Sequence, residues 1–359
     1  MESGKNFSQI GRRPVSLSVR GDLGYVIGVD LGSFLLRVVI TDLNGSLCYR
    51  VEIPTRMGEG REAVLARAFG LMHQAIDKSQ VSRQAVKGIG MAHSGVIDSA
   101  NGTVLSFPRP GQTAQWRNVP LRDMLEAEFG IPAILDDSTR MMAIAEKCFG
   151  IGQQIKDFVY ISVGMGIGAG IFIDDKLYRG SGGGAGEFGH MTVDEDGPLC
   201  SCGNSGCLEV LASCTAIIQS VRTAIQKGVS SKINEWVKGD LDRISIEIIA
   251  RAAKENDALG FRVLYDAVFH IGVALADVIN LLNPSTVVFG GPLFREAGGL
   301  LDTLRTVIRQ RALEKFANEL QLKISTLGSE AGALGAARMV SEKVLLRLYE
   351  EKTQMAHAS

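Results

Sequence analysis

The sequence predicts an α/β fold made of two similar lobes. Apolar segments of strand length alternate with longer segments of helical periodicity along most of the 359 residues, and such alternation is typical of α/β domains. A strand–turn–strand pattern occurs twice, once from Tyr25 and again from Asp157, which indicates a duplicated unit. With 46% hydrophobic and 21% charged residues, the chain can bury a core in each lobe.

The first lobe is expected over 21–138 and begins with a β-meander. Three apolar strands are predicted within 25–53, and the Asn44-Gly45 pair between the last two is a hairpin signal. Hydrophobic periodicity then predicts a helix at 61–79, a buried strand at 86–92 and a helix at 120–130 that ends at Gly130. The strand 134–137 ends in two acids, and the helix after it has Ser138 near its cap. Acids at such a junction suit a ligand site.

The second lobe, expected over 139–330, repeats the opening theme. Its strands at 157–164 and 169–173 flank the glycine-rich turn GMGIG. The chain then reads as mostly helical from 208 to 283, followed by a strand at 286–291, a further helix and strand, and a final helix near 331–352. Residues 1–20 are polar, with a basic pair at Arg12 and Arg13, and are expected to form a linker or tail.

Composition excludes several classes of partner. The formal net charge of -1 gives no general attraction to nucleic acid or to an anionic membrane, because that attraction needs a strongly basic chain. No apolar run approaches the roughly 20 residues that cross a bilayer. Residues 1–20 also lack the apolar centre of a signal peptide. A cytoplasmic protein without a membrane partner is therefore expected.

The most specific motif is a group of one histidine and three cysteines. His190, Cys200, Cys202 and Cys207 supply the Cys₃His donor set of four-coordinate structural zinc sites. Glycines between the last two cysteines allow a tight turn that brings Cys207 back to the same ion. The alternatives are free thiols in a glycine loop and a nucleic-acid-binding zinc knuckle, although no basic residue lies between Arg179 and Arg222. Because four protein ligands leave no position for an activated water, the zinc is predicted to be structural.

The segments EFGHMTV and GPLCSCGNSGCLE, which contain this motif, resemble the signature of the ROK family of repressors, uncharacterised reading frames and sugar kinases. The resemblance extends from about Gly21 to the C-terminal helix. It implies a two-lobed actin-like and hexokinase-like ATPase fold, a ribonuclease H-like duplication with an inserted zinc loop, in which the helix 331–352 packs back on the first lobe. It also implies a sugar bound between the lobes and a homodimer or homotetramer joined through helices of the second lobe.

By this resemblance, five side chains face the sugar: Asp136, Asp137, Glu187, His190 and Glu209. Carboxylates accept strong charge-assisted hydrogen bonds from sugar hydroxyls. His190 can bind zinc through one ring nitrogen and offer the other to a hydroxyl, so that the metal fixes the aim of a sugar-binding group. For Glu187 or Glu209 taken alone, a solvated acid near a helix end is the simpler interpretation.

The family also contains ATP-dependent sugar kinases of the glucokinase and N-acetylhexosamine kinase types, in which Asp137 would be the general base and magnesium-ATP the phosphate donor. The nucleotide side would then comprise Asp30, Gly32, Gly164, Gly166, Gly290 and Gly291. Both phosphate turns depart from the family pattern, because Phe34 and Leu35 replace threonine and lysine in DLGSFLLR and Met165 replaces threonine in GMGIG. Each lost charge-assisted hydrogen bond costs about 1.5 to 3 kcal/mol. Phosphoryl transfer is therefore expected to be absent or weak.

The sugar side departs from the pattern as well. Asp136 replaces an asparagine, and its charge is expected to raise one pKa of the Asp136–Asp137 pair. Ser94-Gly95 replaces a proline-glycine pair in the sugar loop, and Arg109 changes a neighbouring position. The ligand is expected to be a hexose or an amino sugar, without further identification.

The segment GRRPVSLSV at 11–19 resembles the joint between a winged helix-turn-helix and the sugar domain of ROK repressors. That DNA-binding module would precede the joint and is not in this chain, so contact with DNA is expected only through a helix-turn-helix outside it. Arg12 and Arg13 are either a solvated tail or a residual contact to a DNA backbone. The prediction is a sugar-sensing transcriptional regulator; the alternatives are the sugar kinase and a sugar- or partner-binding protein with no DNA role.

Overall fold

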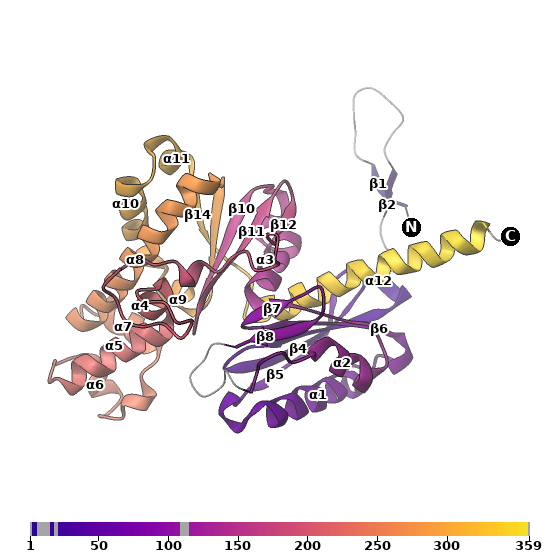
Figure 1. Cartoon of the computed structure of the whole chain (residues 1–359), viewed down its shortest axis with the longest axis horizontal. Coiled ribbons are helices and arrows are strands. Elements are labelled where there is room, and N and C mark those ends of the chain that lie inside the picture. Colours follow the sequence, from indigo (N-terminus) through magenta and orange to yellow (C-terminus); the bar gives the residue numbers. More distant parts are fainter. Residues whose placement is uncertain (1, 6–14, 18–20, 108–114, 358–359) are drawn as a thin grey trace. The chain divides into compact units, whose positions relative to one another are not determined.

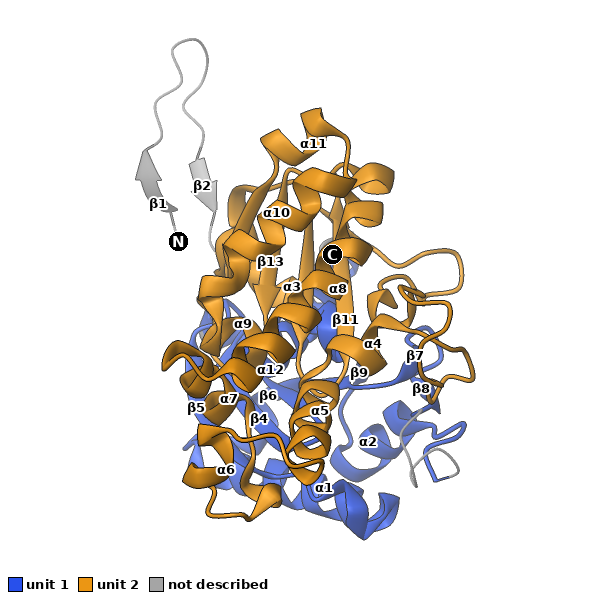
Figure 2. Cartoon of the chain, turned by 90° about the vertical axis from the view of Figure 1, so that its left-hand side faces the viewer, with its two compact units in different colours: residues 1–107, 112–141, 330–359 blue, residues 108–111, 142–329 orange. Residues whose placement is uncertain are grey.

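The computed structural model describes residues 2–5, 15–17, 21–107 and 115–357, and the chain divides into two compact units (Figures 1 and 2). Unit 1 comprises residues 1–107, 112–141 and 330–359, and unit 2 comprises residues 108–111 and 142–329. The chain passes between the units within helix α3 (Ser138–Phe149). The lobe boundary expected from the sequence falls at the first residue of this helix.

Unit 1 is built on a five-stranded sheet with the order β5-β4-β3-β6-β9. The meander β3–β4–β5 is antiparallel, whereas β6 and β9 run parallel to β3. The strands are β3 (Tyr25–Leu31), β4 (Leu35–Asp42), β5 (Leu47–Pro54), β6 (Val86–His93) and β9 (Ala133–Asp137). Gly45, in the predicted hairpin turn, has a φ of 91°, which explains the glycine at this position.

Helices cover both faces of this sheet (Figure 1). On one face, α1 (Arg61–Lys78) and α2 (Leu121–Phe129) bury a core with the strands, and Gly130 ends α2 with a φ of 66°. On the other face lies α12 (Ala331–His357). Its close approach requires glycine in the strands, because a Cβ on Gly28 or Gly90 would lie 2.0 Å from a carbonyl oxygen of α12. A hairpin of β7 (Val96–Asp98) and β8 (Thr103–Ser106) follows β6.

Unit 2 repeats the topology of unit 1. Its sheet has the order β12-β11-β10-β13-β14, with β10–β11–β12 antiparallel and β13 and β14 parallel to β10. The strands are β10 (Phe158–Val163), β11 (Ile167–Ile173), β12 (Lys176–Tyr178), β13 (Thr286–Gly290) and β14 (Gln321–Ile324). The same arrangement of a meander and two parallel strands in both units is the duplication that the repeated sequence pattern predicts.

The helices of unit 2 pack mainly on one face of its sheet and form a large apolar core. They are α4 (Leu208–Ala212), α5 (Cys214–Gln226), α6 (Lys232–Trp236), α7 (Ile246–Lys254), α8 (Ala258–Leu282), α9 (Pro292–Glu296), α10 (Leu301–Arg311) and α11 (Glu314–Glu319). A smaller core joins the sheet to the unit 2 part of α3 on the other face.

The central helix of this core, α8, is long and apolar enough to cross a membrane by length and composition, with a hydropathy of 1.5 over its most apolar window. Arg262, Asp266 and Asp277 interrupt its apolar residues, so α8 is not an uninterrupted apolar run of about 20 residues. Its buried side chains, among them Leu264, Ile271 and Leu275, belong to the unit 2 core. Packing inside a folded unit therefore accounts for its apolar composition.

The N-terminal region contains two short strands where a linker or tail was expected. Strand β1 (Glu2–Lys5) pairs antiparallel with β2 (Val15–Leu17). The basic pair Arg12 and Arg13, and Arg109 near the expected sugar loop, lie outside the described residues.

Candidate functional site

The predicted metal ligands come together in unit 2. The four ligand atoms of His190, Cys200, Cys202 and Cys207 all lie within 4.8 Å of one another. Sγ of Cys202 is 3.7 Å from Sγ of Cys207, and Sγ of Cys200 is 3.7 Å from Nδ1 of His190. Zinc–sulfur bonds of about 2.3 Å in a tetrahedron place two sulfur atoms about 3.8 Å apart. The spacing of the donor atoms therefore fits one tetrahedral zinc ion.

A tight loop of backbone contacts brings these side chains together. The Cys200 N–H donates to the Asn204 carbonyl at 2.7 Å, and the Gly203 N–H donates to the Cys200 carbonyl at 3.0 Å. Gly206 has a φ of 65°, and a Cβ there would lie 1.5 Å from the carbonyl oxygen of Asp194. Only glycine can occupy this point, so the fold of the loop depends on the residue type that the sequence provides.

The thiols differ in their affinity for protons. Partial burial acts to raise the pKa of Cys202, but hydrogen bonds from the Asn204 backbone and the neighbouring thiols outweigh it and lower this pKa. Burial and the adjacent Cys202 and Cys200 thiols raise the pKa of Cys207 to about 12. Three crowded thiols cannot all ionise without a compensating cation, and a divalent metal would supply that charge.

Two predicted sugar ligands, Glu187 and Glu209, are in direct contact with this region of unit 2. Glu187 is exposed, and its Oε2 lies 3.9 Å from Nε2 of His190, the ring nitrogen that faces away from Cys200. Glu209 lies in α4 directly after Cys207, and its Oε2 accepts a hydrogen bond of 2.9 Å from the Ile167 N–H. Glu187 therefore lies beside a predicted metal ligand, whereas the Glu209 carboxylate is bonded to the start of β11, which follows the second glycine-rich turn.

The other two predicted sugar ligands, Asp136 and Asp137, end strand β9 in unit 1. Asp137 caps α3, because its Oδ1 accepts from the N–H groups of Thr139 and Arg140 at 2.8 and 3.1 Å. Ser138, expected near the cap, is the first residue of α3, and its hydroxyl donates to Oδ1 of Asp30 at 3.3 Å. The cap is one residue earlier because the aspartate carboxylate reaches two N–H groups of the first turn.

Asp136 is fully buried and forms an ion pair with Arg140, whose Nη2 and Nε atoms each lie 2.8 Å from its Oδ1. The guanidinium of Arg140 thus supplies the positive charge that pairs with this buried carboxylate. Asp137 is only partly buried. Within unit 1, Asp137 thus has the more accessible carboxylate of the two.

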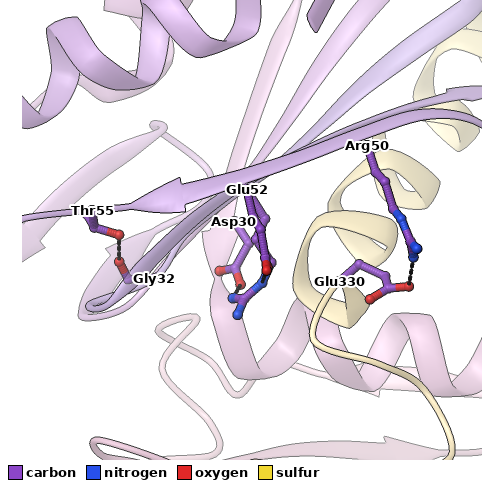
Figure 3. A network of polar contacts seen from close by, with 7 residues as sticks. Asp30, Gly32, Arg50, Glu52, Thr55 and Glu330 are labelled. Atoms are coloured by element: carbon purple, nitrogen blue, oxygen red, sulfur yellow. Dashed lines mark hydrogen bonds and ion pairs between the residues drawn. The ribbon is translucent and has the colours of Figure 1, made fainter.

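The first phosphate turn, between β3 and β4, is tied down by contacts within unit 1 (Figure 3). Asp30 is 1% exposed, and its Oδ2 lies 3.4 Å from Nη1 of Arg37. Nε of Arg37 donates to Glu52 at 3.1 Å. Burial raises the pKa of Asp30 to about 6, against the opposing effects of Arg37 and Ser138. A cationic side chain therefore already occupies the position beside this carboxylate.

Two further contacts hold the same turn. The Thr55 hydroxyl donates to the Gly32 carbonyl at 2.6 Å, and the Thr55 N–H donates to the Phe34 carbonyl at 2.8 Å. Arg50 of β5 pairs with Glu330, the residue before α12, at 3.1 Å (Figure 3). Phe34 itself is 67% exposed. The turn thus projects a large apolar ring where the family pattern has a hydroxyl group.

The second predicted turn and the paired glycines lie together in unit 2. The Gly164 N–H donates to the Gly166 carbonyl at 2.9 Å, and the Thr215 hydroxyl donates to the Met165 carbonyl at 3.1 Å. Gly290 ends β13, and Gly291 has a φ of 88°; a Cβ at Gly291 would lie 2.4 Å from the Val163 carbonyl oxygen. These glycines fit close backbone packing, and the Gly164 N–H is already used within the turn.

Sequence reasoning missed three residues of this arrangement. Arg37 and Arg140 form buried or half-buried ion pairs with predicted site acids. The signal for Arg140 is its spacing, since it follows Asp136 by four residues across a strand-to-helix junction. His93, at the end of β6, pairs in register with Asp137 and is 1% exposed. A lone histidine after an apolar strand carries no such signal in the sequence.

Comparison with known proteins gives consistent matches. A family model described as the ROK family matches residues 26–343. The xylose repressor of Caldicellulosiruptor bescii is 34% identical over 345 residues, which cover 96% of this chain and 85% of the repressor. The crystal structure of a ROK family transcriptional regulator, a homologue of the Escherichia coli MLC protein, is similar with a TM-score of 0.79 at 29% identity, covering 94% of this chain and 83% of that one. A ROK family glucokinase from Streptomyces griseus, in complex with glucose and AMPPNP, gives 0.77 at 29% identity, covering 88% and 99%.

Proposed function

The chain belongs to the ROK family, as its sequence resemblance predicted, and from this premise we propose that it is the sugar-sensing part of a transcriptional regulator. The similarity to a xylose repressor and to a ROK regulator over nearly the whole chain supports this proposal. The ligand in this account is a pentose, hexose or amino sugar, whose binding changes the conformation of the protein and through it the affinity for DNA.

The observation that carries the proposal is the state of the first phosphate turn. A kinase needs its phosphate turns to position and stabilise the transferred phosphoryl group. Here Arg37 lies 3.4 Å from the buried carboxylate of Asp30, and Phe34 projects from the turn with 67% of its surface exposed. Met165 gives the second turn another apolar side chain. The sugar side, in contrast, keeps its acids and its histidine.

On the sugar side, Glu187, His190 and Glu209 of unit 2 are the ligands that we assign to sugar hydroxyls. Oε2 of Glu187 lies 3.9 Å from Nε2 of His190, and Oε2 of Glu209 accepts from the Ile167 N–H. Asp137 of unit 1 is the fourth ligand of this proposal, because one of its oxygens caps α3 and its side chain remains partly exposed. Asp136 acts through its buried pair with Arg140, which fixes the end of β9 and so the position of Asp137.

A zinc ion on His190, Cys200, Cys202 and Cys207 is part of the same proposal. Its role is structural, since four protein donors fill a tetrahedral coordination shell. Nδ1 of His190 is the nitrogen nearest to Cys200, so metal binding at this atom leaves Nε2 for Glu187 and the sugar. The ion would thereby fix the orientation of a sugar-binding ring.

The sugar kinase is the second candidate, because a ROK glucokinase in complex with glucose and AMPPNP has a similar fold at 29% identity. The test is release of ADP from magnesium-ATP in the presence of D-xylose, D-glucose or N-acetyl-D-glucosamine. The regulator account expects sugar binding without turnover. Turnover in the usual kinase range of about 1 to 100 per second, lost in Asp137→Ala, would establish the kinase instead. We also propose that this regulator is cytoplasmic and forms a homodimer or homotetramer, as expected from the sequence.

A further inference from the structure

A cluster of buried rings in unit 1 is not used by the function proposed above. His93 is the last residue of β6, and its ring centroid lies 4.8 Å from that of Trp116 and 5.6 Å from that of Phe107. The three side chains are 1%, 0% and 3% exposed, in that order. We refer to His93, Trp116 and Phe107 as the His93 cluster.

The His93 cluster contains polar atoms that lack partners. Both ring nitrogens of His93 and Nε1 of Trp116 have no hydrogen bond of normal geometry with any residue that the structure describes. A buried polar atom without a partner costs about 1 to 3 kcal/mol, and such atoms are rare in folded proteins. Three of them on two adjacent side chains indicate that the cluster is built to receive a polar group.

The unpaired atoms define the chemistry of that group. Burial lowers the pKa of His93 to about 4, although the nearby Ser94 backbone opposes this shift, so the ring is neutral at pH 7 and offers one donor and one acceptor. The indole of Trp116 adds one donor. The two ring nitrogens of His93 point in diverging directions, so one oxygen atom can bond to only one of them together with the indole N–H. A hydroxyl or water oxygen can accept from the indole and donate to, or accept from, that ring nitrogen. An ammonium group cannot accept the hydrogen bond that the indole N–H donates.

The position of the cluster favours a sugar hydroxyl. His93 pairs in register with Asp137, the partly exposed acid at the end of β9. The Ser94-Gly95 turn, which stands where the family has its sugar loop, follows His93 directly. Gly95 has a φ of 134°, and a Cβ there would lie 2.6 Å from the Ser106 carbonyl oxygen. His93 thus adjoins both Asp137 and the Ser94-Gly95 turn, the two parts of unit 1 that the family resemblance places at the sugar.

We propose that His93 and Trp116 bind one hydroxyl group of the sugar and so contribute to the choice of sugar. The inference rests on the proposed sugar-sensing function. Because both side chains are buried, the hydroxyl group reaches them when the Phe107 ring and the β7–β8 hairpin shift on binding. A captive water can form the same two hydrogen bonds and is the other source of the oxygen atom.

Calorimetry with deoxy sugars distinguishes the two sources. Wild type and His93→Phe are titrated with D-xylose, D-glucose and N-acetyl-D-glucosamine, and then with monodeoxy analogues of the sugar that binds. Loss of one buried hydrogen bond corresponds to about 5- to 10-fold in affinity. We expect His93→Phe to weaken the parent sugar by about this factor and one deoxy analogue to lose the same factor with wild type. His93→Phe should bind that deoxy analogue no more weakly than wild type does, because the substitution and the missing hydroxyl remove the same hydrogen bond.

Several outcomes would overturn the inference. Additive losses for every deoxy analogue, or unchanged affinity in His93→Phe, mean that His93 does not bind a sugar hydroxyl. A His93→Phe protein that melts at lower temperature but keeps the selectivity of wild type identifies a captive water. If wild type binds none of the sugars, the proposed function fails and the inference fails with it. Wild-type binding with the same deoxy selectivity in His93→Phe rejects the inference alone.

Two further variants complete the experiment. Trp116→Phe removes the indole N–H but keeps an aromatic ring. It must show the same non-additive loss of affinity with the same deoxy analogue. This variant keeps the test decisive if His93→Phe does not fold. His73→Phe is the matched control, because the His73 ring stacks 4.5 Å from Phe129 in the same unit. Its nitrogens are already paired, at 2.8 Å with Glu128 and 3.2 Å with Arg83. Its sugar affinity should equal that of wild type.

Discussion

Replacing the buried acid of the first phosphate turn should make unit 1 more stable at neutral pH. Burial raises the pKa of Asp30 from 3.8 to about 6, so the folded protein holds this proton more tightly than the unfolded chain. Ionisation of the buried acid therefore destabilises the folded protein. This destabilisation is absent below pH 3.8, grows as the pH rises, and is complete above pH 6. At 1.36 kcal/mol for each pKa unit, the full cost is about 3 kcal/mol. The asparagine side chain introduced by Asp30→Asn has no proton to lose.

The stability gained by Asp30→Asn over wild type should thus grow by about 2 kcal/mol between pH 4.5 and 7.5. Each protein is unfolded in urea in a Trp236→Phe background, in which the buried Trp116 of unit 1 is the remaining one of two tryptophans. Asp123→Asn, at an aspartate whose side chain is 65% exposed, is the control and should show no such trend. A difference that does not change with pH would refute the reasoning. Stabilisation of wild type but not Asp30→Asn by magnesium-ATP would show instead that Asp30 serves a nucleotide.

Three other changes test separate parts of the account. Metal analysis of wild type should find about one zinc ion per chain, and Cys202→Ser should lose this zinc and unfold with a free energy lower by on the order of 2 kcal/mol. Cys48→Ser, at an exposed thiol, should change neither quantity. Zinc retained in Cys202→Ser would count against the site. Gly28→Ala should destabilise unit 1 by about 1 to 3 kcal/mol in urea denaturation, because its Cβ would lie 2.0 Å from the Ala333 carbonyl oxygen; an unaffected midpoint would mean that α12 does not pack there. Arg140→Met should leave Asp136 buried without its cation and cost about 3 to 5 kcal/mol, whereas Arg122→Met, which removes an exposed pair, should cost under about 1 kcal/mol.

Much of the fold can be predicted from local patterns in the sequence. The Asn44-Gly45 turn and the alternation of short and long apolar segments predict the meander and the strands that follow it, because hydrogen bonding within a hairpin depends on nearby residues. Gly130 ends α2 in the left-handed conformation that only a residue of this type adopts easily. The cysteine spacing predicts the donor cluster for the same reason, since all four ligands lie within 18 residues of one another along the chain.

The electrostatic partners of the site acids could not be predicted in this way. Arg37 reaches Asp30 because β3 and β4 place them opposite each other in register, and this pairing depends on the register of the finished sheet. Asp136 was assigned to the sugar because its position matches the family, but Arg140 covers it in this chain. The burial of the unpaired His93 nitrogens depends on packing against Phe107 and Trp116, which come from later parts of the chain. Tertiary packing determines each of these features.

The central claim is that the chain senses a sugar through the acids beside the cysteine loop, and calorimetry of one variant pair tests it most directly. Wild type, Glu187→Gln and the control Glu195→Gln, at an exposed acid of the same loop, are titrated with D-xylose, D-glucose and N-acetyl-D-glucosamine. The account predicts that at least one sugar binds wild type and Glu195→Gln equally. It also predicts that Glu187→Gln weakens this binding by about 10-fold or more, since a hydrogen bond to a charged group is lost. Equal affinity in all three proteins, or no binding of any sugar to wild type, would contradict it.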